Sequence, residues 1–155
     1  MSRHLVHTVR TRDAAETERL GDAVGAVIDR GACICLTGPL GAGKTVLVRG
    51  LCRGLGAEDP VTSPTFILME SFEGRLPIVH IDLYRLEHER EVEDLGVYDL
   101  IESETVLIAE WGERSPALLE EADIEIRIEP GEGSERTIFV YATSEFTREL
   151  DELSW

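Results

Sequence analysis

The chain contains a single lysine, and this lysine lies in a motif whose residue types could bind phosphate. Lys44 belongs to the segment GPLGAGKT at positions 38–45, which fits the pattern GxxxxGK[ST]. In loops of this pattern, backbone N–H groups surround nucleotide phosphates, the lysine reaches the β and γ oxygens, and the following hydroxyl helps to hold magnesium. The predicted nucleotide-binding residues of this loop are Gly38, Leu40, Gly41, Ala42, Gly43, Lys44 and Thr45.

The segments on either side of the motif have the character that a phosphate loop requires. Residues 32–37 form a short apolar run typical of a strand, and residues 45–54 begin a helical pattern with Leu47, Leu51 and Leu55 on one face. Glycines let the main chain approach an anion, and the start of the helix directs its positive dipole end at the phosphates. The alternative is a glycine-rich turn that binds no ligand.

Two carboxylates follow apolar runs elsewhere in the chain. Asp82 closes the run at 78–81, and Glu110 closes the run at 106–109. In α/β nucleotide hydrolases, acids at the carboxyl ends of core strands hold magnesium or position water. Either residue therefore qualifies as the acid near the metal. The competing interpretation is that each acid only caps its strand or the following turn.

Three further segments give weaker signals. Ser63 and Thr65 flank Pro64, in a region where switch segments often contact the γ-phosphate, although an ordinary turn explains them equally well. Trp111 could stack on a nucleotide, while packing in the core is the commoner fate of tryptophan. His80 is interpreted as a strand residue that packs in the core rather than as a catalytic base.

Composition limits the class of protein. The 155 residues suit one domain spanning 1–155, and 31 acidic against 15 basic residues give a net charge of −16. Such a charge argues against a broad nucleic-acid-binding face, so no direct DNA partner is expected. The chain has no apolar signal core and no run of membrane-spanning length, which predicts a cytoplasmic protein without a membrane partner. Cys33, Cys35 and Cys52 are predicted to be buried hydrophobes.

Hydrophobic periodicity and turn residues predict alternating strands and helices. Strands are predicted over 4–10, 32–37, 65–72, 76–81, 105–109, 124–128 and 136–142. The first helix is predicted to be capped by Thr11 or Asp13 and to reach residue 28. Further helices are predicted over 45–54, 88–95 and 115–121, with a turn or helix over 97–101 and an acidic tail or helix over 144–155. Turns at 73–75 and 130–134 indicate two hairpins, and Asp13 with Glu16 resembles a helix-capping box.

The sequence contains neither Asn nor Gln. Guanine recognition by an NKxD motif needs Asn, and Ras-type positioning of water needs Gln, so a GTPase of that kind is disfavoured. Protein kinases need an Asn in the catalytic loop and a different glycine-rich loop, so that class is excluded.

Four segments in order give the chain a recognisable pattern: GPLGAGKT at 38–45, SPTF at 63–66, HIDLYRL at 80–86 and AEWGER at 109–114. Together they resemble the bacterial TsaE (YjeE) family, the ATPase of tRNA threonylcarbamoyladenosine biosynthesis. The resemblance extends over almost the whole chain. It implies an α/β domain of the P-loop NTPase-like type, with a mixed central sheet that is partly parallel, carries antiparallel hairpins and is flanked by helices.

The same resemblance implies ATP as the nucleotide, Mg2+ as the cofactor and a role for each matching residue. Lys44 would contact phosphate, Thr45 and Glu110 would bind magnesium, and Asp82 would activate or position water. Val46 departs from the second threonine that family members commonly carry, which puts a hydroxyl contact to the α-phosphate in doubt. Further residues implied are Ser63 and Thr65 in a switch loop, Trp111 beside the nucleotide, and Asp13 and Arg136 on its adenine or ribose side.

The resemblance also implies partners. Family members act as accessory motors that bind TsaD and TsaB and reset them between turnovers. The expected interaction with tRNA is therefore indirect, through that complex. An acidic chain is compatible with docking against a basic protein face. Two other classes stay open from the residues alone. One is a small-molecule or nucleoside kinase, which would need an acceptor pocket and usually an arginine-bearing lid, and the other is a nucleotide-sensing adaptor without catalysis.

Overall fold

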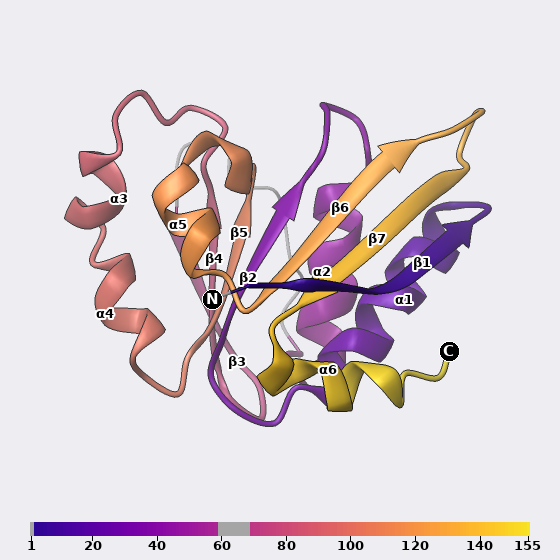
Figure 1. Ribbon diagram of the computed structural model, residues 1–155, viewed down its shortest axis with the longest axis horizontal. Helices are drawn as coiled ribbons and strands as arrows, with labels where there is room; N and C mark the ends of the chain where they lie inside the picture. Colours follow the sequence, from indigo (N-terminus) through magenta and orange to yellow (C-terminus); the bar gives the residue numbers. More distant parts are fainter. Residues whose placement is uncertain (1, 59–68) are drawn as a thin grey trace.

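A seven-stranded mixed sheet forms the centre of the molecule (Figure 1). The computed structural model describes residues 2–58 and 69–155. The strand order across the sheet is β1-β7-β6-β2-β5-β4-β3. The strands are β1 (His4–Thr11), β2 (Ala32–Thr37), β3 (Met69–Glu73), β4 (Pro77–Asp82), β5 (Val106–Glu110), β6 (Ile124–Pro130) and β7 (Arg136–Ala142).

The middle of the sheet is parallel and its edges are antiparallel. Strand β2 pairs in parallel with β5 and β6, and β5 pairs in parallel with β4. The hairpins β6–β7 and β3–β4, together with β1 on β7, add the antiparallel pairs. Strands β2 and β5 are buried at every position, as expected for parallel strands covered on both faces. The predicted mixed sheet is therefore confirmed.

Helices cover both faces of the sheet (Figure 1). One apolar core lies between the sheet and α1 (Ala14–Val27), α2 (Lys44–Gly54) and α6 (Ser144–Asp151). A second core lies against α3 (Arg90–Asp94), α4 (Val97–Ile101) and α5 (Pro116–Glu121), while a short 3₁₀ turn spans Gly112–Arg114. Within the described residues, no helix combines the length and the apolar character needed to cross a membrane.

Helices α1 and α2 pack closely through glycines. A Cβ atom added at Gly50 would lie 2.0 Å from the Glu18 carbonyl oxygen, and one at Gly54 would lie 2.1 Å from that of Asp22. Gly21 and Gly25 make similar approaches from α1, since a Cβ atom added at these positions would lie 2.5 and 2.3 Å from carbonyl oxygens of α2. The backbones of the two helices therefore touch, which fixes α2 and the residues at its start.

Two carboxylates and one arginine form hydrogen bonds at the ends of these helices. The Asp13 side chain accepts a hydrogen bond from Glu16 N at 2.9 Å, so Asp13 is the N-cap of α1 as predicted. The Glu16 carboxylate reaches back one residue further than in a standard capping box, to Arg12 N at 2.7 Å. At the opposite ends of α1 and α2, Arg75 donates to three backbone carbonyl oxygens, those of Gly54, Gly25 and Ile28.

The element boundaries agree with the sequence except at a few ends. The strand predicted over 65–72 is described only from Met69, because residues 59–68 lie outside the described part of the chain. The acidic tail forms α6 and then leaves helical structure, and Trp155 is 43% exposed with the Arg19 guanidinium 5.6 Å from its ring centroid.

Candidate nucleotide-binding site

The loop between β2 and α2 lies at the carboxyl end of β2, at the top of the view in Figure 1. Gly38, Gly41 and Gly43 have φ angles of 136°, 78° and 103°, a region that side chains other than glycine rarely adopt. Helix α2 begins directly after Gly43, which has no side chain to cap the first N–H groups of the helix. These N–H groups and the positive end of the helix dipole together suit an anion.

Lys44 is folded back over the loop that carries it. Its Nζ donates to the carbonyl oxygens of Gly38 and, at 2.9 Å, Pro39, and it lies 3.8 Å from the centroid of the Trp111 ring. Burial lowers the pKa of Lys44, while nearby carboxylates, Glu113 first, oppose that shift. The ammonium group is therefore already at the loop, held by weak acceptors that phosphate oxygens could replace.

Glu110 connects the loop to the neighbouring strand. Its Oε1 accepts a hydrogen bond from Thr45 Oγ1 at 3.1 Å, and its Oε2 lies 2.7 Å from His80 Nε2. The side chain of Glu110 is 3% exposed. Thr45 and Glu110, the two magnesium ligands that the family resemblance implies, are thus in direct contact.

Asp82 lies beside Glu110 at the same end of the sheet, because the parallel register of β4 and β5 pairs these two residues. Its Oδ1 accepts a hydrogen bond from Tyr84 N at 2.9 Å. Burial raises the pKa of Asp82, and the nearby Glu110 carboxylate adds to the shift. Two carboxyl groups that stand at strand ends therefore converge near the start of α2.

The oxygen donors of this cluster suit magnesium. Mg2+ is usually held by one or two carboxylates together with water and substrate phosphates, rather than by an all-protein cage. The described residues contain no group of three His, Cys, Asp or Glu side chains that could enclose a metal ion by themselves. The Thr45 hydroxyl and the Glu110 carboxylate fit this smaller set, and Asp82 lies beside them where it could contact a water molecule of the ion.

Trp111 lines the edge of this cluster. Among the described residues it is the one non-glycine residue with positive φ, at 61°, and strained backbone of this kind is concentrated at functional sites. Lys44 Nζ lies 3.8 Å from the centroid of the Trp111 ring, the Tyr84 ring centroid is 5.0 Å away, and the Arg114 guanidinium is 5.7 Å away. The structure thus brings Trp111 to the loop and adds Tyr84 and Arg114, to which the sequence analysis assigned no role.

Arg136 contacts the other side of the loop. Its Nε donates to Ala42 O at 2.8 Å and its Nη2 to Gly41 O at 3.2 Å. Next to it is a cavity of about 200 Å³. The lining residues are Ala14, Thr17, Gly41, Gly43, Val46, Ser134 and Arg136. Asp13 is adjacent in sequence but does not line this cavity, since its carboxylate caps α1 through Glu16 N.

Besides Tyr84 and Arg114, two further site residues were missed by sequence reasoning. Glu113 Oε2 accepts a hydrogen bond from Gly38 N at 2.9 Å, so this glutamate holds the base of the loop. His80, interpreted as core packing, is fully buried but also contacts Glu110. The sequence does indicate that His80 lies on the same face of its strand as Asp82, because residues two apart in a strand share a face. Ser63 and Thr65, the predicted switch residues, lie outside the described residues.

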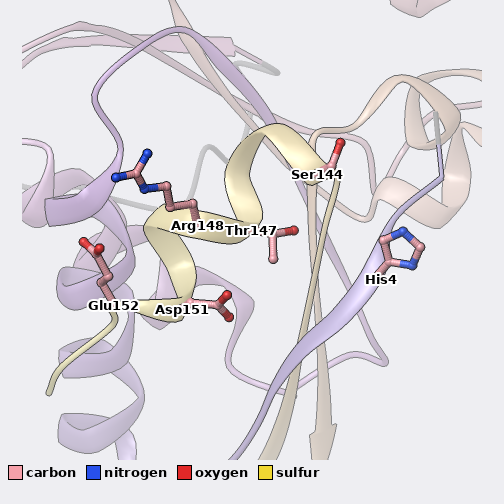
Figure 2. Close-up of a pocket in the computed structure, with 6 residues that line it drawn as sticks. All are labelled: His4, Ser144, Thr147, Arg148, Asp151 and Glu152. Carbon is pink, nitrogen blue, oxygen red and sulfur yellow. The ribbon is translucent and has the colours of Figure 1, made fainter.

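A second hollow, of about 480 Å³, lies between β1 and α6 (Figure 2). Its lining residues are His4, Ser144, Thr147, Arg148, Asp151 and Glu152. None of them belongs to the loop or to the carboxylate cluster. The loop and the carboxylates that could bind nucleotide and metal therefore lie at the carboxyl ends of β2, β4 and β5, away from this hollow.

The fold and the loop geometry define a class: this is an α/β domain of the P-loop NTPase-like type. The family profile described as "Threonylcarbamoyl adenosine biosynthesis protein TsaE" matches residues 11–138. The chain belongs to the TsaE family, whose members are named for tRNA threonylcarbamoyladenosine biosynthesis. The resemblance inferred from the four sequence segments is thereby confirmed.

Relatives agree over most of the chain. The TsaE protein of Treponema pallidum is 39% identical over 118 residues, which cover 76% of this chain and 87% of that protein. The TsaE protein of Bacillus subtilis is 33% identical over 147 residues, covering 94% and 92%. The crystal structure of Bacillus subtilis YdiB is similar with a TM-score of 0.74 and 27% identity, covering 98% of this chain and 95% of that one.

Proposed function

We propose that this protein binds and hydrolyses ATP with magnesium, as an accessory subunit of the machinery that makes threonylcarbamoyladenosine at position 37 of tRNA. In this proposal, hydrolysis resets a complex of TsaD-like and TsaB-like proteins between turnovers. The observation that carries the ATPase part is the hydrogen bond from Thr45 Oγ1 to Glu110 Oε1, 3.1 Å long. It joins the hydroxyl of the phosphate loop to an acid of the neighbouring strand, which a glycine-rich turn without a ligand would not require.

Phosphate binding follows from the loop and from Lys44. The N–H groups at the start of α2 would bind the phosphate oxygens, and Lys44 Nζ would exchange the carbonyl oxygens of Gly38 and Pro39 for the β and γ oxygens. A hydrogen bond between two charged groups is stronger than one to a neutral carbonyl. The exchange therefore favours the bound state and needs little movement of the main chain.

In this proposal, Glu110 and Asp82 have different roles, one at the magnesium ion and one at the attacking water. Magnesium, when bound, would neutralise charge that develops on the phosphate oxygens. Thr45 Oγ1 and Glu110 would hold it, and Asp82 would orient the attacking water or accept its hydrogen bond. Because burial raises the pKa of Asp82, its carboxylate is also a better proton acceptor than an exposed aspartate. Trp111 would lie against the nucleotide and Arg136 on the far side of the loop.

The partner part of the proposal is supported by family membership and charge. The relatives are named for tRNA threonylcarbamoyladenosine biosynthesis, and the net charge of this chain is −16. Such a charge opposes direct wrapping of tRNA and favours docking against a basic protein face. Contact with tRNA would therefore be indirect, through the TsaD-like and TsaB-like partners.

Phosphate release from ATP tests both parts. Hydrolysis should be slow for the chain alone and should rise when TsaD, TsaB and tRNA are added. Nucleotide binding can be measured by Trp111 fluorescence in a Trp155→Phe background. Lys44→Ala should abolish binding, whereas Arg148→Ala, on α6 beside the second hollow, should bind nucleotide normally. Absence of release in every mixture would refute the ATPase, and nucleotide binding without release would favour an adaptor. Release that requires a small hydroxyl acceptor would favour a kinase.

A further inference from the structure

Both oxygens of the Glu110 carboxylate have a partner, and one partner lies outside the phosphate loop. Thr45 Oγ1 donates to Oε1, and His80 Nε2 lies 2.7 Å from Oε2. His80 is completely buried, and Glu110 is 3% exposed. The contact is therefore shielded from water, where a hydrogen bond is stronger than on the surface.

The sheet register explains how His80 reaches Glu110. Ile78 of β4 and Ile108 of β5 belong to the core beneath α1 and α2, so residues of the same parity in each strand face α2. His80 pairs with Ile108 and Asp82 pairs with Glu110, which makes His80 the diagonal neighbour of Glu110 on that face. An imidazole at this position can form a hydrogen bond with the Glu110 carboxylate, whereas an aliphatic side chain could only pack against it.

The hydrogen-bonding pattern of the ring indicates which nitrogen carries the proton. Nδ1 of His80 is buried and has no hydrogen-bond partner within the described part of the chain. A buried N–H without a partner is rarer and costlier than an acceptor with an unused lone pair. The proton is therefore assigned to Nε2, and His80 donates to Glu110.

We propose that His80 is a positioning residue for the magnesium site. Its Nε2–H fixes one oxygen of Glu110 and so keeps the other oxygen at Thr45, where magnesium would be held. A packing role alone would favour an apolar side chain, because burying a polar ring is costly unless the ring forms a hydrogen bond. Hydrogen bonds to metal-ligating side chains typically change metal affinity or activity by about 10–100-fold. This inference rests on the proposed magnesium-dependent ATPase.

Two amide variants separate the hydrogen bond from simple packing. In His80→Gln the amide nitrogen can occupy the place of Nε2 and donate to Glu110, whereas in His80→Asn the side chain is one methylene too short. The magnesium concentration for half-maximal hydrolysis should rise about 10–100-fold in His80→Asn and stay close to wild type in His80→Gln. Nucleotide affinity measured with EDTA, by Trp111 fluorescence, should be equal in all three proteins.

The outcomes distinguish this inference from the proposed function. If magnesium changes neither nucleotide binding nor turnover in the wild type, the proposed function fails and the inference fails with it. If the wild type responds to magnesium and His80→Asn responds equally, only the positioning role is refuted, and the same holds if Gln rescues no better than Asn. Thermal unfolding shows whether each variant is folded.

A spectroscopic measurement keeps the inference testable even if both variants fail to fold. Nitrogen-15 NMR of the wild-type imidazole, without nucleotide, should show the proton of His80 on Nε2 and none on Nδ1. A proton on Nδ1 alone would overturn the assignment, since His80 could not then donate to Glu110.

Discussion

The close contact between α1 and α2 makes Gly50→Ala a sharp test of how the fold fixes the phosphate loop. A Cβ atom at Gly50 would lie 2.0 Å from Glu18 O and 2.9 Å from Asp22 N. Both atoms belong to the backbone, so no side-chain rotation can relieve the contact. Since Cβ atoms essentially never approach within 3.0 Å, the helices must separate locally by at least 3.0 − 2.0 = 1.0 Å.

Two opposing effects set the expected magnitude. Overpacking of a close-packed contact costs about 1–3 kcal/mol, and a rigid backbone contact favours the upper end. Alanine is about 1 kcal/mol better than glycine inside a helix, which offsets part of this cost. The net loss should be about 2 kcal/mol, which corresponds to a fall in unfolding temperature of about 4–8 °C for a chain of this size.

Urea unfolding followed by circular dichroism measures this loss. Arg49→Ala, on the exposed side of the same helix, removes only a surface ion pair of 3.6 Å with Glu18 and should cost less than about 1 kcal/mol. Nucleotide affinity should also fall in Gly50→Ala, because the displaced helix carries Lys44 and Thr45. A Gly50→Ala protein as stable as the wild type would refute the proposed tight coupling of the helices.

Three further substitutions test the site and its support. Glu110→Ala should slow magnesium-dependent hydrolysis by at least about 10–100-fold, the loss typical for groups that only support a metal ligand, and a wild-type rate would reject its metal role. Because burial raises the pKa of Asp82, its protonated carboxyl group contributes stability in acid that is lost as pH rises through the folded pKa. Asp82→Asn should therefore raise the unfolding temperature above that of wild type by more at neutral pH than in acid. Equal increases at both pH values would contradict this. Arg75→Ala should cost about 1–3 kcal/mol in denaturant unfolding, since it removes a charged donor from three helix-end carbonyls. Arg127→Ala, at an exposed position of β6, should cost little.

Local sequence signals were sufficient for the core of the site. The apolar run before Gly38 and the leucine spacing after Thr45 predicted strand, loop and helix in order, and the structure has β2 and α2 there. Asp82 and Glu110 could be assigned to one end of the sheet because each ends a parallel strand, and parallel strands present their carboxyl ends together.

Contacts that depend on register or on the choice of neighbours could not be predicted. The contact between His80 and Glu110 needs β4 to lie beside β5 in one particular register, and no local pattern specifies it. The glycines of α1 and α2 recur four residues apart in each helix, but their spacing does not reveal which two surfaces meet. Glu113 lies in a recognised segment, yet its bond to Gly38 N depends on how the turn after β5 folds back.

Side chains from other elements hold the main chain of the loop in place. Glu113 holds the N–H of Gly38 and Arg136 holds the carbonyl oxygens of Gly41 and Ala42, so both ends of the loop are fixed by side chains from other elements. In the proposed function, Lys44 would exchange its carbonyl partners for phosphate oxygens, while Thr45 and Glu110 would bind magnesium. Because little conformational entropy remains to be lost on binding, the affinity of the loop for phosphate should depend on these two supporting side chains as well as on Lys44.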